Sequence, residues 1–204
     1  MHNILIFGDS IAAGRKVEKI RSWPLLLSQY IDREDKDFTL VHNLSIPGET
    51  TNEIVKRFPT EAEARCKRIY PNDHSSIIFA AGINDTKSVK VRDDSITNTE
   101  DFKNNIELLI ENARKCTDHI IFVGLTPVDE GKTIPAGDAY FLNEQIKSYE
   151  KIIDRICKEN KIGLLSIIDE WLTIDYIRLL SDDGIHPNEM GHQRIFEKIR
   201  PFFS

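Results

Sequence analysis

The sequence predicts an α/β fold in which helices cover both faces of a parallel β-sheet. Short runs rich in Ile, Val, Leu and Phe recur along the chain, and longer amphipathic segments separate them. These runs do not alternate with polar residues, which is typical of strands that are buried on both faces. The length of 204 residues suits one such domain. Because no repeat or low-complexity tract marks a boundary, we expect a single domain over residues 1–204.

Five apolar runs have the length of strands. In chain order they cover residues 3–7, 39–43, 76–80, 119–124 and 164–168. Since strands and helices alternate along the whole chain, right-handed crossovers would place all the strands parallel to one another. The prediction is therefore a doubly wound sheet of about five strands in a three-layer α/β/α arrangement.

The segments between these runs carry signals for helices. Pro24 follows Trp23 at a position where the first turn of a helix tolerates proline. Thr50 or Thr51, followed by Asn52 and Glu53, is typical of a capped helix start. Further helices are expected from residue 98 onward, over 140–157 and over 189–199. The polar segment 87–95 and the segment 129–138 are expected to be long loops, which either border a site or lie passively on the surface.

Bulk properties exclude several classes of protein. The formal net charge of -6 and the absence of a basic stripe disfavour a nucleic-acid partner. The apolar run near the N-terminus has no basic leader and is too short for a signal-peptide core or a membrane span. We therefore expect a cytoplasmic protein without a membrane span, and a signal peptide that has been removed is the alternative.

The three cysteines suggest neither a disulfide framework nor a zinc site. Cys66, Cys116 and Cys157 are far apart in the sequence, are odd in number and form no Cys-x-x-Cys pair. Cys116 and Cys157 both fall late in expected helices. Reduced and buried thiols are therefore expected at these two positions.

Ser10 is the candidate nucleophile. It ends the motif Gly8-Asp9-Ser10, directly after the first apolar run, and α/β proteins place their chemistry at the carboxyl ends of strands. A serine hydroxyl needs a neighbouring base to take its proton. We expect a tight strand-to-helix turn here, which would place the Ser10 N–H at the positive end of a helix. Taken alone, the tripeptide also fits an ordinary turn or helix cap.

His186 is the candidate base, and Asp183 is its candidate acid. A loop that carries Asp-x-x-His can bring the carboxylate to one ring nitrogen while the other nitrogen faces a serine. Pro187 restricts His186 to an extended backbone conformation. Asp182 is adjacent to Asp183 and is the alternative acid, so the choice between them rests on spacing.

Asn84 and Gly48 are the candidate donors for an oxyanion hole. Acyl transfer develops negative charge on a carbonyl oxygen, which donors placed in advance stabilise. Asn84 follows the third apolar run and offers a side-chain amide, and Gly48 follows the second run and offers an unobstructed N–H. The alternatives are an Asx turn at Asn84 and a plain turn glycine at Gly48.

Together these residues resemble the SGNH hydrolases, also called the GDSL esterase/lipase family. The resemblance extends over essentially the whole chain, through the blocks at residues 7–10, 48, 82–85 and 183–187. It implies a flavodoxin-like fold with Ser10 as nucleophile, His186 as base and Asp183 as acid. It further implies an oxyanion hole formed by the N–H groups of Ser10 and Gly48 and by the amide of Asn84.

The departures from the family pattern are small. Ile11 stands where the family usually has leucine, which is an apolar exchange that conserves volume. The resemblance assigns no catalytic role to Asp9 or Asp85, and we expect both to brace their loops through backbone hydrogen bonds.

The expected activity is hydrolysis of small or short-chain acyl esters through an acyl-serine intermediate. The substrate would be a small-molecule acyl ester, with no metal and no organic cofactor. Thioesterase, lysophospholipase and acyltransferase activities would use the same site. A non-catalytic ligand-binding domain, or a phosphoryl acceptor at Asp9, are alternatives of another class. The natural substrate and the oligomeric state stay open at this level.

Overall fold

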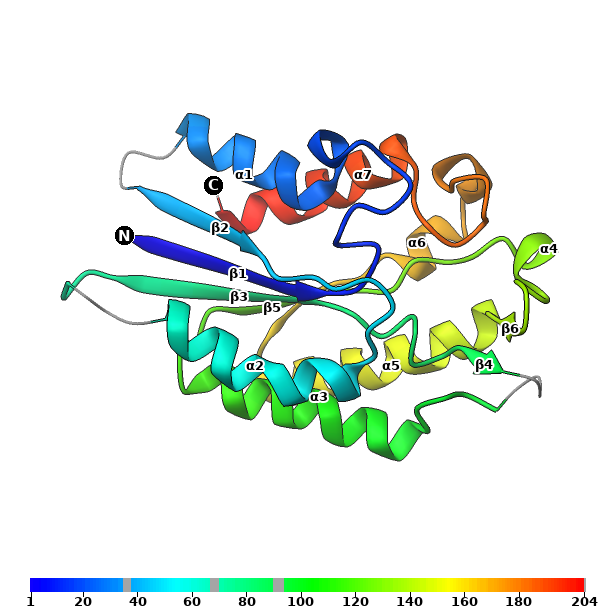
Figure 1. Ribbon diagram of the computed structural model, residues 1–204, viewed down its shortest axis with the longest axis horizontal. Helices are drawn as coiled ribbons and strands as arrows, with labels where there is room; N and C mark the ends of the chain where they lie inside the picture. Colours follow the sequence, from blue (N-terminus) through cyan, green and yellow to red (C-terminus); the bar gives the residue numbers. More distant parts are fainter. Residues whose placement is uncertain (35–37, 67–69, 90–93, 204) are drawn as a thin grey trace.

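Five parallel strands form the central sheet of the computed structural model, which describes residues 1–34, 38–66, 70–89 and 94–203 (Figure 1). The strands are β1 (His2–Gly8), β2 (Thr39–Asn43), β3 (His74–Ala80), β5 (Ile120–Val123) and β7 (Gly163–Leu165). Their order across the sheet is β2-β1-β3-β5-β7, and every neighbouring pair is parallel. The predicted doubly wound α/β fold is confirmed.

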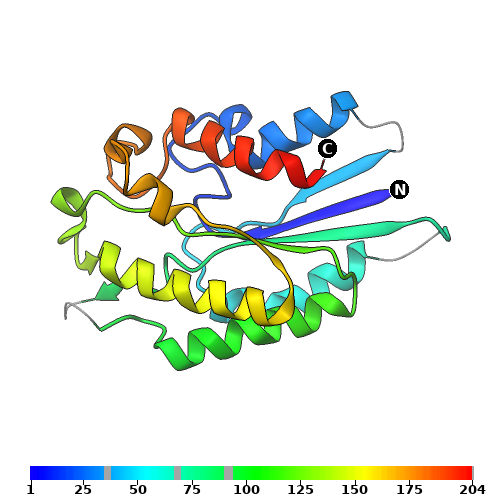
Figure 2. The same cartoon turned by 180° about the vertical axis from the view of Figure 1, so that it is seen from behind.

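Two layers of helices enclose this sheet. Figures 1 and 2 show α1 (Trp23–Glu34) and α7 (Glu189–Ile199) on one face, and α2 (Thr51–Arg65), α3 (Thr99–Arg114) and α5 (Asn143–Asn160) on the other. The shorter helical pieces are α4 (Glu130–Thr133), α6 (Ile168–Trp171) and the 3₁₀ turns Lys19–Arg21, Tyr176–Leu179 and Arg200–Phe203. Within the described residues, no helix is long and apolar enough to cross a membrane.

The apolar character of β1 follows from burial on both of its faces. Leu5 and Phe7 pack into the core beneath α2, α3 and α5, whereas Ile4 and Ile6 pack into the core beneath α1 and α7. All four side chains are completely buried. Because successive side chains of a strand point to opposite faces, the middle of a strand between two helical layers is apolar on both sides.

Local capping explains where several helices begin. Asn98 precedes α3 and accepts hydrogen bonds from the backbone N–H groups of Glu100 and Asp101. Thr50 is the N-cap residue of α2, and its N–H donates to the Glu53 carboxylate at 2.9 Å. These bonds satisfy backbone donors that the first turn of a helix leaves unpaired.

The segment after Ser10 differs from the prediction. The chain runs through consecutive turns over residues 10–16 and a 3₁₀ turn at Lys19–Arg21, and α1 begins only at Trp23. The expected strand-to-helix turn at Ser10 is therefore wrong, and the Ser10 N–H does not lie at the N-terminus of a helix.

Two other predicted boundaries were wrong. The last strand ends at Leu165 rather than at residue 168, because Ile168 already begins α6. The helix predicted over 140–157 begins at Asn143 and extends to Asn160, where Lys161 takes a left-handed conformation with φ 56°. Tyr140 belongs instead to the short strand β6 (Ala139–Tyr140).

Of the two segments expected to be loops, segment 87–95 contributes one strand to a second, small sheet. Strand β4 (Ser88–Val89) pairs antiparallel with β6, and Ser88 lies opposite Tyr140. Segment 129–138 is also not a plain loop, since it contains α4. Residues 90–93 of the expected loop 87–95 lie outside the described residues. The pairing joins segments that are about fifty residues apart in the sequence, which no local pattern of turn residues predicts.

The strand order places the topological switch point of the sheet next to Ser10. The chain leaves β1 toward β2 on one side, and β3 lies on the other side of β1. In open α/β sheets, ligands bind outside the carboxyl ends of the strands at such a point of reversal. The segments that follow β1 and β3 carry Ser10 and Asn84, so both lie at this edge of the sheet.

Candidate active site

Gly8 at the end of β1 allows the chain to pass closely over its neighbours. A Cβ atom at this position would lie 2.6 Å from the carbonyl oxygen of Ala80 and 2.7 Å from the Cβ of Ala12. The next residue, Asp9, accepts a hydrogen bond from the Ile11 N–H at 2.9 Å through Oδ1. This bond fixes the turn in which Ser10 lies, and Ser10 itself is 6% exposed.

A chain of hydrogen bonds joins Asp183, His186 and Ser10. The Nδ1 atom of His186 lies 2.7 Å from Asp183 Oδ2, and its Nε2 atom lies 2.8 Å from Ser10 Oγ. An ionised carboxylate only accepts hydrogen bonds, so the ring proton belongs on Nδ1. The Nε2 atom is then free to accept the proton of the Ser10 hydroxyl.

The loop that carries these two residues is held by its own backbone. Asp183 Oδ1 accepts the N–H groups of Ile185 and His186, each at 3.0 Å. Gly184 between them has φ +73°, a conformation that glycine adopts without strain. Beyond Pro187, Asn188 caps α7 by accepting the N–H groups of residues 190 and 191. The side chain of His186 is therefore positioned by a closed turn on one side and a capped helix on the other.

The two adjacent aspartates occupy different environments. The side chain of Asp182 is 82% exposed and forms an ion pair with Lys16 at 3.1 Å. The side chain of Asp183 is 24% exposed and is the one that contacts the His186 ring. The structure thus brings Asp183, and not Asp182, to the histidine.

The electrostatics of the pair leave the imidazole neutral. Burial lowers the pKa of His186 below its ordinary value, and this effect outweighs the opposing influence of the Asp183 carboxylate. Burial would raise the pKa of Asp183, but hydrogen bonds from the N–H groups of His186 and Ile185 and from the His186 ring hold it below its ordinary value. A neutral imidazole beside an ionised carboxylate is the state that a general base requires.

Asn84 and Gly48 lie beside one another because of a third residue, Glu49. The Asn84 side-chain Nδ2 donates to the Glu49 carbonyl oxygen at 2.9 Å, which leaves the second amide N–H available. The Glu49 carboxylate is in turn held by the Arg57 guanidinium of α2, with a shortest contact of 2.6 Å. Gly48 has φ +88° and would meet no atom within 4 Å of an added Cβ. Among the described residues, the N–H groups of Ser10 and Gly48 find no protein acceptor.

Asp9 and Asp85 brace the site, as the sequence suggested. Asp85 accepts the backbone N–H of Thr51 at 3.0 Å and its hydroxyl at 2.6 Å, which ties the end of β3 to the start of α2. Burial raises the pKa of Asp9 to about 7 and that of Asp85 to about 6. Because Asp9 is 2% exposed and already bonded to Ile11, it is poorly placed to accept a phosphoryl group.

Several contacts at the site carry no signal in the sequence. Lys16 reaches Asp182 and lies 4.0 Å from Asp183, and the positive charges of Arg15 and Lys16 both lower the pKa of His186. The short helix α4 borders the histidine loop, since the Asp129 N–H donates to the Gly184 carbonyl at 2.8 Å. Across the described ranges, no group of three or more His, Cys, Asp or Glu side chains is placed to hold a metal ion.

The model of the GDSL-like lipase/acylhydrolase family matches residues 6–194. The chain belongs to this family. No match was found among curated protein sequences. The family assignment covers all the positions discussed above, from Ser10 to His186, and it identifies the protein as a hydrolase of the GDSL type.

Several solved structures share the fold of this GDSL-family chain. A lipase/acylhydrolase from Enterococcus faecalis has a TM-score of 0.79 at 20% identity, covering 98% of this chain and 94% of that chain. TesA has a TM-score of 0.74 at 19% identity, covering 99% and 98%. An acetyl xylan esterase from Geobacillus stearothermophilus has a TM-score of 0.76 at 16% identity, covering 98% and 94%. At these identities the likeness establishes the fold.

Proposed function

We propose that this protein is a serine esterase that hydrolyses small or short-chain acyl esters. The observation that carries the proposal is the hydrogen-bond chain from Asp183 through His186 to Ser10, with the partner distances of 2.7 Å and 2.8 Å. A base within this reach can take the hydroxyl proton as the oxygen attacks.

In the first half of the reaction, Ser10 Oγ attacks the ester carbonyl and His186 Nε2 takes its proton. Asp183 stabilises the imidazolium that forms. The carbonyl oxygen becomes negative and accepts hydrogen bonds from the N–H groups of Ser10 and Gly48 and from the free amide N–H of Asn84. His186 then returns the proton to the leaving alcohol, which departs and leaves the acyl group on Ser10.

In the second half, water replaces the alcohol. His186 takes a proton from the water as it attacks the acyl-serine carbonyl, and the same donors stabilise the second oxyanion. The acid leaves and Ser10 regains its proton. A thiol leaving group, a lysophospholipid or an acceptor alcohol would use the same steps, so thioesterase, lysophospholipase and acyltransferase activities are close variants.

Two observations favour a small acyl group. Ser10 and His186 are each 6% exposed, so little room for approach surrounds the nucleophile. An acetyl xylan esterase is among the structural neighbours, and an acetyl group is the smallest common acyl group of natural esters. The proposal therefore places acetyl and other short-chain esters ahead of long-chain ones.

The test is hydrolysis of p-nitrophenyl esters from acetyl to palmitoyl by the native protein, by Ser10→Ala and by Ser148→Ala. Ser148 is an exposed serine on α5, far along the chain from Ser10, and serves as the matched control. We expect Ser10→Ala to lose at least about 10³-fold in kcat, while Ser148→Ala keeps native activity. Preference for palmitoyl over acetyl would overturn the small-acyl assignment.

A fluorophosphonate probe separates the remaining outcomes. Labelling of the native protein and of Ser148→Ala, but not of Ser10→Ala, would support an active serine even if every nitrophenyl ester is a poor substrate. If the native protein neither turns over an ester nor takes the label, the protein is a non-catalytic binding domain.

A further inference from the structure

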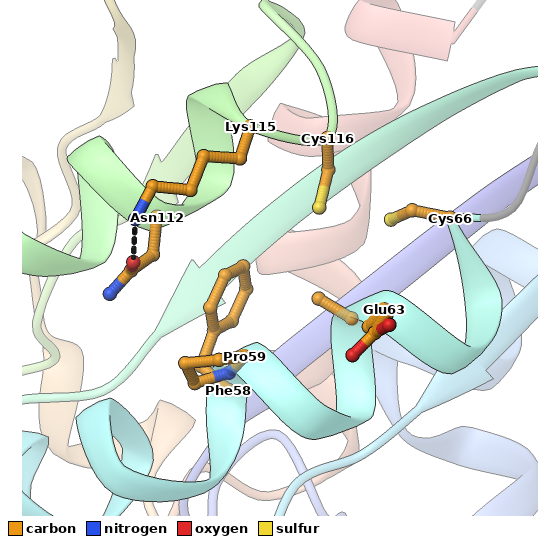
Figure 3. Close-up of a pocket in the computed structure, with 8 residues that line it drawn as sticks. Phe58, Pro59, Glu63, Cys66, Asn112, Lys115 and Cys116 are labelled. Carbon is orange, nitrogen blue, oxygen red and sulfur yellow. Dashed lines mark hydrogen bonds between the residues drawn. The ribbon is translucent and has the colours of Figure 1, made fainter.

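Two of the three cysteines face each other across a pocket on the surface of the helical layer. Cys66 follows the last residue of α2, and its N–H donates to the Ala62 carbonyl at 2.8 Å. Cys116 follows α3, and its N–H donates to the Ala113 carbonyl at 2.9 Å. Figure 3 shows the two sulfur atoms turned toward one another. The expectation of a buried thiol is confirmed for Cys157 and wrong for Cys116, which is half-buried.

The pocket beside the two thiols has room for a small molecule. Its volume is about 550 Å³, within the range of pockets that bind small ligands. Phe58, Pro59 and Ala62 of α2 supply its apolar wall, and Glu63 and Lys115 supply charges. The Lys115 ammonium is held by Asn112 at 2.7 Å, as Figure 3 shows. Cys66 and Cys116 are half-buried, so a reagent in this pocket can reach them.

We propose that Cys66 and Cys116 form an oxidisable dithiol site that reacts with small-molecule disulfides and closes into an internal disulfide bond. This site is independent of the proposed esterase activity. It lies where α2 and α3 end, at the edge of the sheet opposite the carboxyl ends of the strands.

The roles of the two thiols follow from their surroundings. A hydrogen bond from the Cys116 thiol lowers the pKa of Cys66 to about 7, against the opposing effect of burial. The same hydrogen bond, together with burial and the charge on Cys66, raises the pKa of Cys116. Cys66 is therefore the attacking thiolate, and Cys116 is the thiol that resolves the mixed disulfide.

The reaction balances as two thiol–disulfide exchanges. The Cys66 thiolate attacks one sulfur of the small disulfide, whose S–S bond breaks, and one half leaves as a thiolate that takes up a proton. Cys116 then loses its proton and attacks the Cys66 sulfur, which forms the internal bond and releases the other half as a thiol. The two protein thiols lose two electrons and two protons, and the small disulfide is reduced to two thiols.

The first exchange prepares the second. Once Cys66 carries the mixed disulfide, it has no negative charge, so this obstacle to deprotonation of Cys116 disappears. The neighbouring Lys115 charge then favours the Cys116 thiolate. Cys157 differs from both, because it is 1% exposed and burial raises its pKa to about 12. It is expected to stay reduced.

The experiment treats the full-length native protein with glutathione disulfide at pH 7 and follows it by intact mass, thiol counting and thermal unfolding. We expect a monomer that loses two hydrogen atoms, keeps one free thiol at Cys157 and yields a peptide pair linked through Cys66 and Cys116. Closing a loop of about fifty residues should raise Tm by roughly 5–15 °C, and a thiol reductant should reverse the rise. Disulfide-linked dimers, a stable glutathione adduct on the native protein, or a bond that includes Cys157 would each overturn the proposal.

Two variants at Cys116 test the hydrogen bond. Cys116→Ser keeps a hydroxyl that donates to the Cys66 thiolate, whereas Cys116→Ala removes the donor. Both variants should trap one glutathione on Cys66. At pH 7 we expect Cys116→Ser to react about threefold faster, because a higher thiolate fraction outweighs the lower nucleophilicity of a more acidic thiol. Equal rates with the same pH midpoint in both variants would refute the assigned roles.

Discussion

Asp183→Asn is the substitution that examines the proposed site most directly. The asparagine oxygen can still accept the two backbone N–H groups that Asp183 Oδ1 accepts, so the loop keeps its turn. Only the atom that faces the imidazole changes, from a carboxylate oxygen at 2.7 Å to an amide NH₂. That NH₂ donates to Nδ1, so the ring proton moves to Nε2, which then donates to Ser10 and cannot take its proton.

The expected loss follows from the charge pair in the transition state. An imidazolium and a carboxylate whose charges lie about 4 Å apart, at an effective dielectric constant of about 20, attract one another by about 4 kcal/mol. This energy corresponds to about 10³-fold in rate. Because the Asp183 side chain is 24% exposed, water recovers part of it. We therefore expect a loss of about 10²–10³-fold in kcat/KM.

The assay compares kcat/KM for the best nitrophenyl ester between the native protein, Asp183→Asn and Asp182→Asn. Asp182 is the matched control, since its side chain is 82% exposed and its ion pair with Lys16 is screened by water. We expect Asp182→Asn to stay within about twofold of the native protein. Thermal unfolding of both variants shows whether either one has lost its fold.

This role of the Asp183 carboxylate would be refuted by an Asp183→Asn protein that folds and stays within tenfold of native activity. It would equally be refuted if Asp182→Asn lost as much activity as Asp183→Asn. Either result would mean that the carboxylate next to the ring does not set the state of His186.

Three further predictions concern Asn84, His186 and Glu150. Asn84→Ala removes one oxyanion donor and should lower kcat by about 10²-fold with little change in KM; a change confined to KM would contradict the assigned role. Because burial lowers the pKa of His186, the decline of kcat/KM at acid pH should have its midpoint below 6.5, and a midpoint above 6.5 in a pH–rate profile would contradict this prediction. Glu150, which accepts the Leu125 N–H at 2.7 Å, has a pKa raised by burial from 4.5 to about 7, so its contribution to the stability of the native protein is lost as pH rises from 4.5 to about 7. Glu150→Gln should remove this loss. From pH 5 to pH 8, the unfolding free energy of the variant should therefore rise relative to that of the native protein by up to about 3 kcal/mol, as measured by urea titration at both pH values. If the difference between the two proteins is the same at both pH values, Glu150 does not titrate in this range.

Local patterns were sufficient for most of the sheet and for the starts of α2, α3 and α7. Four of the five strands were predicted within about two residues, because each contains a short apolar run. The Asn98 cap was also predicted, since helix capping depends on residues within about four positions of one another in the chain. The order of the candidate site residues was also readable, because each follows a strand and parallel strands end at one edge.

Contacts between distant segments decided the rest. No local rule says which of Asp182 and Asp183 contacts His186. The turn through Gly184 brings Asp183 to the imidazole, whereas Asp182 pairs with Lys16. The β4–β6 pair joins a segment that was expected to be a loop to residues at the expected start of a helix. Helix α1 begins thirteen residues after residue 10, because the intervening turns are held by their own backbone bonds.

The sequence by itself determined the fold class, the strands and the positions at which polar side chains follow them, because burial and capping act over a few neighbouring residues. Only the tertiary structure decided which side chains meet. Cys66 and Cys116 illustrate the difference, since they are about fifty residues apart in the sequence and face each other only because α2 and α3 end side by side. Such contacts between distant side chains depend on how the helices pack on the sheet, and that packing is a property of the whole chain.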